Sequence, residues 1–465
     1  MSEQPGGAGV TQELEGLYGE RLGRYQAAIA LEPTDRVPIA PGSNYFAEVY
    51  SGNTNQETLY DPAKWVEGEL EFVRAFPETD VLRDNRLWGP QLDAIGLRSY
   101  KLPGRDLAAR DQFQFVEREY MMADEYNLLI ADPLEFMFER WFPRILGEYE
   151  RPGSRRSYMA FLKSGMAQGM YAQIMRDRSI RLQEVAGMPQ PMTGAFVAPF
   201  DVLADTLRGL TGAIMDCFRQ PDKVVAACDR LVEEMANFAL RTADPLKRYP
   251  IFVPTHKPCF LSPDQFDRFY WPSFKKVLEI LIGAGYKVRA YLEGDWSAHW
   301  HHMLELPKGS VLCDIDNQGD IFRAKRDIGH HQCLAGGIQD SQFILGTTDQ
   351  IREQVKRLCE SVGVGGGFII SGGCNIPYTT KPENYRAMIE ATLEFGTYDA
   401  SLRPMPKQTV GPTIVDAFDY PKKMTPWTAK KQELGGAVPG DERLIQRPWD
   451  DLEAMAYAWL WQWTM

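Results

Sequence analysis

From about residue 195 onward, apolar runs alternate with helical patterns at a regular spacing. The runs are AFVAPF (195–200), IFVPTH (251–256), KVRAYLEG (287–294), SVLCDID (310–316), QCLAGGI (332–338) and GFIISGG (367–373). Most of them are continuous, which is typical of strands that are buried on both faces of a parallel sheet. This rhythm restricts the chain to folds in which strands and helices alternate.

Helix-start signals separate these runs. A Ser or Thr that is followed three residues later by Gln or Glu predicts a capping box. Three boxes are predicted, at Ser262 with Gln265, Thr347 with Gln350, and Thr380 with Glu383.

Two earlier segments, DRVPIAP (35–41) and DVLRD (80–84), also read as short buried strands. With them, eight strand candidates alternate with helices, which predicts an α/β fold of the (β/α)8 TIM-barrel type. An open doubly wound sheet is the alternative. No strand candidate is followed by a G-x-G-x-x-G turn into a helix, so the barrel is favoured.

The expected barrel domain covers residues 1–400 and includes an insertion at about 98–195. Antiparallel-looking pieces, FQFVEREYMM and NLLIAD, are followed there by a Met-rich, mainly helical stretch that could cap a pocket. Residues 401–465 form a C-terminal extension. Its tryptophans favour packing on the barrel or a subunit interface, as in a homodimer.

Charge and cysteine usage exclude several classes of partner and compartment. The net charge of −12 argues against nucleic acid and anionic membranes, which require a basic surface. No apolar run reaches the roughly 18 residues of a membrane span, and no secretory signal is recognised. The seven cysteines are scattered and odd in number, which fits a reducing, cytoplasmic setting.

In a barrel of this type, catalytic side chains lie at the carboxyl ends of the strands. The polar residues at these ends are Asp84, His256, Tyr291, Glu293, Asp295, Asp314, Asp316, Gln339, Asp340, Cys374 and Asn375. His256, Glu293 and Cys374 together suit zinc, which accepts imidazole, carboxylate and thiolate ligands.

Readings without a metal remain open for each of these three residues. Cys374 could be a small buried residue, His256 a hydrogen-bonded rim histidine, and Glu293 a substrate-facing acceptor or general acid. The stretch SAHWHHM (297–303) offers His299 and His302 on one helix face, but a polar helix surface is the favoured reading there.

Three stretches resemble the uroporphyrinogen decarboxylase superfamily: DRVPIAP, CFLSPDQFDRFYWPSFKKVLEIL and GGCNIPYTTKPENYRAM. The resemblance covers most of residues 20–397 and implies a (β/α)8 barrel. One branch of the superfamily decarboxylates uroporphyrinogen without a cofactor. The other transfers methyl groups to or from a corrinoid protein or a thiol, and typically binds zinc through a His-x-Cys pair and a last-strand cysteine.

The last-strand cysteine of this resemblance carries over to Cys374. The His-x-Cys position is occupied by Tyr291-Leu292-Glu293, so the chain departs from the family pattern. We expect Glu293 to serve as a zinc ligand and His256 to supply the missing nitrogen. Such an oxygen- and nitrogen-rich site suits an ether or alcohol oxygen better than a thiol.

The segment PGSNYFAEVYSG (41–52) contains no arginine, although the decarboxylase branch uses an Arg-rich segment there. Its aromatic side chains favour a small, neutral or aromatic substrate over a polyanion. The residues expected to bind the substrate are Tyr45, Phe46, Tyr291, Asp295 and Asn375.

The resemblance therefore implies a methyltransferase of a corrinoid-dependent O-demethylation system, with Glu293, Asp314 and Asp84 as catalytic residues. The chain has no D-x-H-x-x-G motif, so the cobalamin-type corrinoid is expected on a partner protein. A cofactor-free decarboxylase or lyase that uses Asp84, Asp314 or Asp316 as its acid is the alternative. A non-catalytic binding barrel is a third reading.

Overall fold

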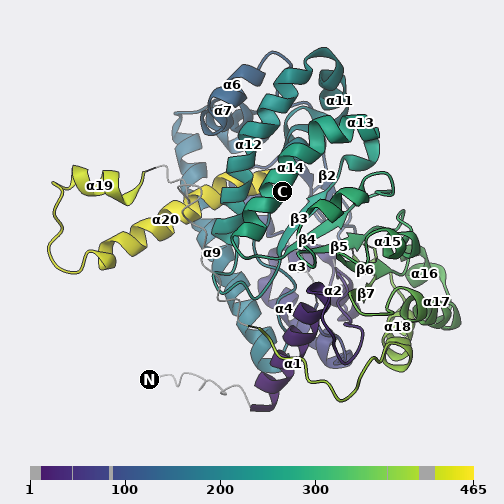
Figure 1. Ribbon diagram of the computed structural model, residues 1–465. Helices are drawn as coiled ribbons and strands as arrows, with labels where there is room; N and C mark the ends of the chain where they lie inside the picture. Colours follow the sequence, from purple (N-terminus) through teal and green to yellow (C-terminus); the bar gives the residue numbers. More distant parts are fainter. Residues whose placement is uncertain (1–11, 44, 83–86, 374, 408–424) are drawn as a thin grey trace, which may run out of the picture.

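Five of the apolar runs pair side by side in one parallel sheet (Figure 1). The computed structural model describes residues 12–43, 45–82, 87–373, 375–407 and 425–465. The sheet order follows the chain, β3-β4-β5-β6-β7. Its strands are β3 (Ile251–Thr255), β4 (Val288–Leu292), β5 (Val311–Ile315), β6 (Cys333–Gly337) and β7 (Phe368–Ser371). Almost every strand residue is buried, as the continuous apolar runs predict.

The other three predicted strands lie at the two edges of this sheet. Ile39 bridges Ile370 of β7 in parallel, and the carbonyl of Ile39 accepts a bond of 2.8 Å from the amide of Asp80. At the opposite edge, Ala195 bridges Phe252 of β3. The eight runs therefore follow the order expected for a (β/α)8 barrel. Backbone bonds in the described ranges do not join residues 80–82 to residues 194–196, so the α/β parallel sheet is established and closure remains a prediction.

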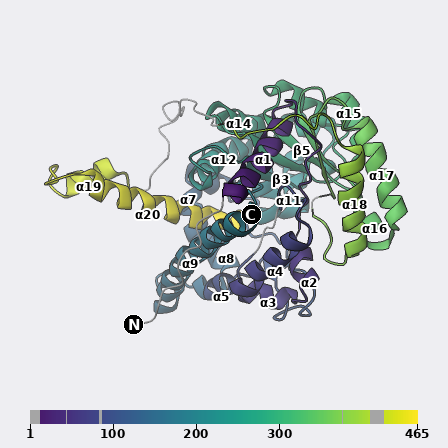
Figure 2. The ribbon, with the colours of Figure 1, turned by 90° about the horizontal axis from the view of Figure 1, so that it is seen from below.

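Helices connect successive strands and cover the outside of the sheet (Figures 1 and 2). In the half of the chain that holds the sheet they are α10 (Pro199–Asp201), η3 (Val202–Leu207), α11 (Gly209–Arg219), α12 (Pro221–Thr242), η4 (Pro258–Phe260), α13 (Pro263–Gln265), η5 (Phe266–Tyr270), α14 (Trp271–Gly283), η6 (Trp300–Glu305), α15 (Ile321–Asp327), α16 (Asp340–Leu345), α17 (Thr348–Ser361) and α18 (Pro382–Phe395).

Two of the three predicted capping boxes are confirmed. Both boxes, at Ser262 with Gln265 and at Thr347 with Gln350, make their reciprocal bonds. The third prediction is wrong, because α18 begins at Pro382 and its N-cap is Lys381, which makes no side-chain cap bond. Proline is preferred at the first helical position, and this places the N-cap one residue beyond Thr380.

The N-terminal third of the chain is mainly helical, and part of it packs against the long helix α9 (Arg155–Ala186). Its other elements are α1 (Gln12–Ile29), α2 (Phe46–Tyr50), α3 (Asn55–Tyr60), α4 (Pro62–Ala75), α5 (Gly89–Ile95), β1 (Tyr100–Lys101), β2 (Gln114–Phe115), α6 (Tyr126–Ala131), α7 (Pro133–Phe136), η1 (Met137–Trp141), α8 (Phe142–Ile145) and η2 (Gly147–Tyr149). NLLIAD, which was predicted to be extended, lies in α6 instead. A buried ion pair between Arg178 and Glu69, with Nε to Oε2 at 2.6 Å, fastens α9 to α4.

The C-terminal segment consists of α19 (Trp427–Glu433), α20 (Arg443–Trp461) and η7 (Gln462–Thr464). The end of α20 is buried: Trp459 Nε1 donates a bond of 2.9 Å to Ser164 Oγ of α9, and Tyr457 is hydrogen-bonded to Glu234 of α12. Residues 425–456, which we call the arm, project away from the body in both views (Figures 1 and 2).

The sequence also carried expectations about membrane-spanning segments and about the cysteines. None of the helices described is long and apolar enough to cross a lipid bilayer. The six described cysteines are all free thiols, and Cys259 is the exposed one among them.

Candidate active site

His256 and Glu293 occupy equivalent positions at the ends of neighbouring strands. Each is the first residue after its strand, and the last strand residues, Thr255 and Leu292, are register partners. Asp316 follows β5 in the same way, because Leu292 pairs with Ile315. Adjacent strands lie about 4.8 Å apart, so the sheet itself brings the three side chains into one row.

Two carboxylates hold His256 from behind, one at its ring and one at its backbone amide. Its Nδ1 lies 2.7 Å from Oδ2 of Asp205, and its backbone amide donates a bond of 3.1 Å to Oδ2 of Asp201. Both aspartates belong to the α10–η3 segment, which follows the 195–198 run, and their i, i+4 spacing points them to the same side. The Nδ1 contact leaves Nε2 of His256 directed at the mouth of the site.

Lys257 and Tyr270 complete the network behind His256. Nζ of Lys257 lies 2.7 Å from Oδ1 of Asp205 and 3.1 Å from Oε2 of Glu117. The hydroxyl of Tyr270 donates a bond of 2.8 Å to Asp201. Two cationic side chains thus share Asp205, which is itself almost completely buried.

The electrostatics of this network separate the pKa values of its members. Burial opposes the charge of His256, but the hydrogen bond to Asp205 and the carboxylates of Asp205, Asp201 and Glu293 outweigh it and raise its pKa to about 9. Burial, and then the charge of Asp205, raise the pKa of Asp201 to about 7. Burial would also raise the pKa of Asp205, yet its bonds to His256 and Lys257 lower it. Asp205 therefore carries the negative charge of this cluster.

Glu293 is the half-exposed carboxylate at the front of the site. Its Oε2 lies 3.7 Å from Nε2 of His256. Burial raises its pKa; the charge of His256 opposes this shift and the charge of Asp316 adds to it. A carboxyl group in this setting retains a proton more readily than an ordinary glutamate and can pass it to a substrate.

Tyr291 and Asp316 lie beside Glu293. The Tyr291 hydroxyl donates a bond of 2.7 Å to Oδ1 of Asp316, and the amide of Gly294 donates one of 2.9 Å to Oδ2. Gly294 adopts φ +77°, a conformation that few other residues take up, and a Cβ there would collide with Cys259. The glycine thus lets the chain turn tightly enough to reach Asp316.

Asp314 lies one layer deeper in the barrel than Asp316. Its carboxylate forms a two-point ion pair with Arg289, at 2.6 and 3.1 Å, and both side chains are buried. The Arg289–Asp314 and Tyr291–Asp316 pairs repeat the same strand offset, two residues apart, because alternate residues point inward. Both carboxylate oxygens of Asp314 are engaged by Arg289 inside the sheet, a setting that disfavours its predicted role as a proton donor.

The remaining predicted residues are dispersed. Phe46 packs in the core against Phe72 and Tyr385, at ring distances of 5.4 and 5.7 Å. Asp295 is exposed and accepts a bond of 2.8 Å from the amide of Ser297. Asn375 is half-buried beside Ile376. Asp84 and Cys374 lie outside the described residues.

Tyr45 contributes to an aromatic wall near Asp205. Its ring lies 6.3 Å from that of Phe113, which lies 5.4 Å from Tyr100. Burial raises the pKa of Tyr100, and the charges of Asp205 and Tyr45 add to this shift. Tyr100 also donates a bond of 2.7 Å to the carbonyl of Met465, so the last turn of the chain closes this side.

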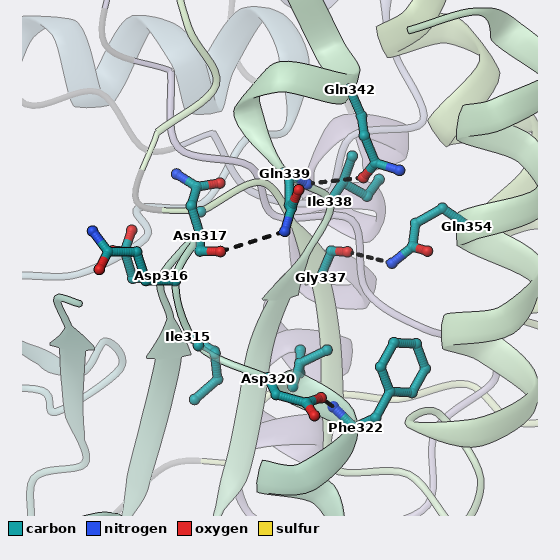
Figure 3. A pocket seen from close by; sticks show the side chains of 14 residues that line it. Ile315, Asp316, Asn317, Asp320, Phe322, Gly337, Ile338, Gln339, Gln342 and Gln354 are labelled. Atoms are coloured by element: carbon teal, nitrogen blue, oxygen red, sulfur yellow. Dashed lines mark hydrogen bonds between the residues drawn. The ribbon is translucent and has the colours of Figure 1, made fainter. Parts of the chain in front are cut away.

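An amide-rich pocket of about 390 Å³ opens on the other side of Asp316 (Figure 3). Its walls come from the ends of β5 and β6 and the loop at Gly373. Gln354 donates a bond of 2.8 Å to the carbonyl of Gly337, and Gln342 accepts one of 3.1 Å from the amide of Gln339. The pocket can hold a neutral polar group beside the row of strand-end side chains.

The geometry of His256 and Glu293 fits two ligands of one zinc ion. Ligands about 2.1 Å from a tetrahedral metal are about 3.4 Å apart, close to the 3.7 Å observed. Asp205 on the other ring nitrogen is the partner that zinc-bound histidines usually have. Within the described ranges, however, no group of three His, Cys, Asp or Glu side chains is arranged to hold a metal. The predicted third ligand, Cys374, is not among the residues described.

The histidines of SAHWHHM make contacts within the structure. His299 stacks on Phe266 with a ring distance of 4.2 Å. His302 contacts Glu305 at 2.7 Å and Asp267 at 2.9 Å through its two ring nitrogens. Both rings are buried, so the expectation of a polar helix surface is wrong for His299 and His302.

Sequence reasoning missed the residues behind His256, namely Asp201, Asp205, Lys257 and Glu117. The signal that could have found the two aspartates is the D-x-x-x-D spacing directly after the AFVAPF run. Lys257 adjoins His256 in sequence. Glu117 lies far away in the chain, and nothing local to it predicts its place.

Comparison with known proteins supports the family assignment. The family "Uroporphyrinogen decarboxylase (URO-D)" matches residues 173–395. A protein named uroporphyrinogen decarboxylase from Pseudoalteromonas translucida (strain TAC 125) is 28% identical over 137 residues, which is 29% of this chain and 38% of that protein. The match thus spans well under half the length of this relative.

Two solved structures resemble the chain. A methyltransferase from Methanosarcina mazei has a TM-score of 0.54 at 17% identity, covering 80% of this chain and 98% of that one. A B12-independent methionine synthase from Shewanella sp. W3-18-1 covers 77% of this chain and 96% of that one, at 10% identity and a TM-score of 0.37, too low to establish a shared fold. The first likeness establishes the fold. The match of residues 173–395 to the uroporphyrinogen decarboxylase family agrees with the resemblance seen in the sequence.

Proposed function

We propose that the chain is a methyltransferase of a corrinoid-dependent system. It would transfer a methyl group from a methoxylated or similar small, neutral or aromatic donor to a Co(I) corrinoid carried by a partner protein. The observation that carries the proposal is the His256–Glu293 pair, with Nε2 3.7 Å from Oε2 and the imidazole fixed by Asp205. The fold shared with the Methanosarcina mazei methyltransferase adds support.

Methyl transfer from an ether breaks a carbon–oxygen bond whose oxygen leaves as a strong base. The site must therefore supply a proton or a Lewis acid to that oxygen. Glu293, whose pKa is raised, is the residue that would donate the proton, and His256 would stabilise the negative charge that develops. A Co(I) corrinoid on the partner protein would supply both electrons of the new bond to the methyl carbon, while the electron pair of the broken C–O bond would stay on the oxygen that Glu293 protonates.

Zinc held by His256, Glu293 and Cys374 would supply Lewis acidity at the same oxygen. With or without zinc, residues of the chain hold His256 and Glu293 in position. Asp205 fixes the imidazole, and the sheet register fixes the separation of His256 and Glu293. The aromatic wall at Tyr45 and Tyr100 would accept the ring or alkyl part of the donor, since no arginine from residues 41–52 is available to bind carboxylates.

A cofactor-free decarboxylase or lyase is the second candidate. The matched family and the name of the curated relative favour it. Lys257 and a protonated His256, both beside Asp205, could hold one carboxylate of such a substrate. Asp316 would be its proton donor, because Asp314 is committed to Arg289.

The test uses the purified protein, free cob(I)alamin and a panel of methoxylated aromatic compounds. We expect loss of the Co(I) absorption band together with release of the demethylated phenol. Glu293→Gln should reduce the rate by about 10²-fold or more, as for a general acid or ligand, while Asp264→Asn, at an exposed aspartate of α13, should not. Bound zinc, measured by elemental analysis, should fall in a Cys374→Ala variant.

Release of CO2 from a carboxylated substrate, in the presence of a chelator and without any corrinoid, would replace the first candidate by the second. Full methyl transfer by a protein that contains no zinc would refute the metal-assisted form of the proposal and leave Glu293 as the acid. Unchanged activity of Glu293→Gln would refute the role given to the His256–Glu293 pair.

A further inference from the structure

The arm carries an apolar stripe that continues beyond the part of α20 buried in its own chain. Trp459 and Trp463 are buried in the body. Toward the N-terminus the same helix face continues through Met455, Leu452, Pro448 and Leu444, and these four are exposed. A helix that is apolar on one side is expected to bury that side, so half of this stripe lacks its cover within the described residues.

A second exposed apolar stripe lies on α9. It consists of Met159, Leu162, Met166 and Met170, and Leu162 and Met166 are 57% and 63% exposed. Ser164, which receives the bond from Trp459, lies about 160° around the helix from both. The chain's own α20 therefore packs on one side of α9 and leaves the opposite side open.

We propose that the arm of one protomer packs along the outer face of α9 of a second copy of the chain, and that this exchange forms a homodimer. The two stripes have the same spacing when they run antiparallel. Along α9 the steps from Met159 are three, four and four residues, and backward along the arm from Met455 they are also three, four and four. This is the seam spacing of two packed helices.

Charge complementarity supports the same alignment. Residues 155–170 of α9 contain Arg155, Arg156 and Lys163 and no acidic residue. Residues 448–456 of the arm contain no basic residue, and Asp451 and Glu453 flank Leu452, whereas Asp450 lies about 160° around the helix from it. The antiparallel alignment that matches Leu162 with Leu452 brings these two stretches together. A parallel alignment would instead place Arg443 and Arg447 against the basic stretch of α9.

The occupant is a second copy because the described residues of one chain do not bring its two stripes together. The arm projects away from the body in both views (Figures 1 and 2), and the anchor at Trp459 fixes its origin on the far side of α9. A twofold axis would use the arm–α9 contact twice, once in each direction, as in most homodimers. The methionines of the α9 stripe suit such a contact, since they adapt to an incoming helix.

Sedimentation equilibrium of the full chain tests the proposal. We expect the unaltered protein to be a dimer at micromolar concentration. Leu162→Asp and Leu452→Asp should each weaken the dimer by about 30-fold or more, and the milder Met166→Ala by less. Leu345→Asp, a matched change at a leucine that is 77% exposed on α16, should leave the dimer intact. Unchanged thermal unfolding would confirm that each variant is folded.

A mixing experiment identifies the surfaces that meet. In a mixture of Leu162→Asp and Leu452→Asp protomers, the intact arm of one can pack on the intact α9 of the other, so dimers should reappear. A monomeric unaltered protein would overturn the proposal. It would also be overturned by a Leu162→Asp protein that dimerises normally, or by a mixture that stays monomeric.

Discussion

Nδ1 of His256 lies 2.7 Å from Oδ2 of Asp205, and the same carboxylate binds the ammonium of Lys257 through its other oxygen, at 2.7 Å. One buried aspartate therefore determines the orientation of the imidazole and part of its charge. The His256–Glu293 separation depends on the sheet register, whereas the direction of Nε2 depends on Asp205.

Replacing Asp205 by asparagine should leave the fold intact and damage the site. The amide keeps a hydrogen bond to His256 but removes the charge, so the pKa of His256 should fall. We expect the turnover number to decrease by about 10- to 100-fold, the range found for partners of this kind. Steady-state kinetics and an NMR titration of His256 provide the measurements, with Asp264→Asn on α13 as the matched control. If the pKa of His256 in the variant equals that in the parent protein, the role given to Asp205 is contradicted.

Tyr291→Phe should affect substrate handling more than stability. The hydroxyl donates to Asp316, and losing a hydrogen bond to a charged group costs about 1.5–3 kcal/mol, or about 10- to 100-fold in rate or affinity. We expect KM and kcat to change without a comparable change in the melting temperature. If the variant melts far below the parent while its kinetics are normal, the Tyr291–Asp316 pair is structural only.

Breaking the Arg289–Asp314 pair should destabilise the protein. Asp314→Asn leaves the guanidinium of Arg289 buried with a weaker partner, and loss of one member of a buried ion pair costs about 3–5 kcal/mol. Urea unfolding measures the change. The double variant Arg289→Met/Asp314→Leu should lose less, since no buried charge remains. Loss of activity by Asp314→Asn without loss of stability would instead support the catalytic role expected for Asp314 from the sequence.

Trp459→Ala should detach the C-terminal segment from α9. The side chain is buried and bonds to Ser164, and truncating a buried aromatic residue costs about 3–5 kcal/mol. Limited proteolysis should then cut near residue 455 faster than in the parent. Trp449→Ala, on the arm, is the matched control and should not change the rate of cleavage near residue 455. Equal proteolysis of the parent and Trp459→Ala would show that the segment is held elsewhere.

Asp35→Asn should reduce stability at neutral pH but not in acid. Burial would raise the pKa of Asp35, but two bonds of 2.7 Å from the Arg24 guanidinium lower it below its unfolded value of about 3.9. Stability from the ionised form is present above that value and is lost as the pH falls through the folded-state pKa. Urea unfolding should show a difference of about 1–3 kcal/mol at pH 6 that shrinks toward pH 3. A difference that stays constant with pH would exclude this linkage.

The sequence predicted the sheet well because each of its strands is a short, continuous apolar run. IFVPTH and KVRAYLEG correspond to β3 and β4 within a residue or two, since strands buried on both faces must be apolar throughout. NLLIAD failed as a strand because a short apolar run has no period that distinguishes it from a buried helix turn. The Thr380 box failed because Pro382 fixes the helix start.

The site was predicted in part for the same reason. His256, Glu293 and Asp316 follow predicted strands, and the rule that strand ends carry catalytic side chains found all three. Asp205 and Glu117 could not be found in this way, because their place depends on helices and loops that meet only in the folded chain. The depth of Asp314 depends on strand register, which the sequence does not state.

Because His256 and Glu293 are attached at matched positions of paired strands, their spacing is independent of the connecting loops. The loops that carry Tyr45 and Phe113 can therefore diverge without moving this pair. If the proposed function holds, descendants of such a gene could acquire new methyl donors by exchanging loops while retaining the same chemistry. The register of β3 and β4 would thus preserve the reaction during evolution, while changes in the loops alter the choice of substrate.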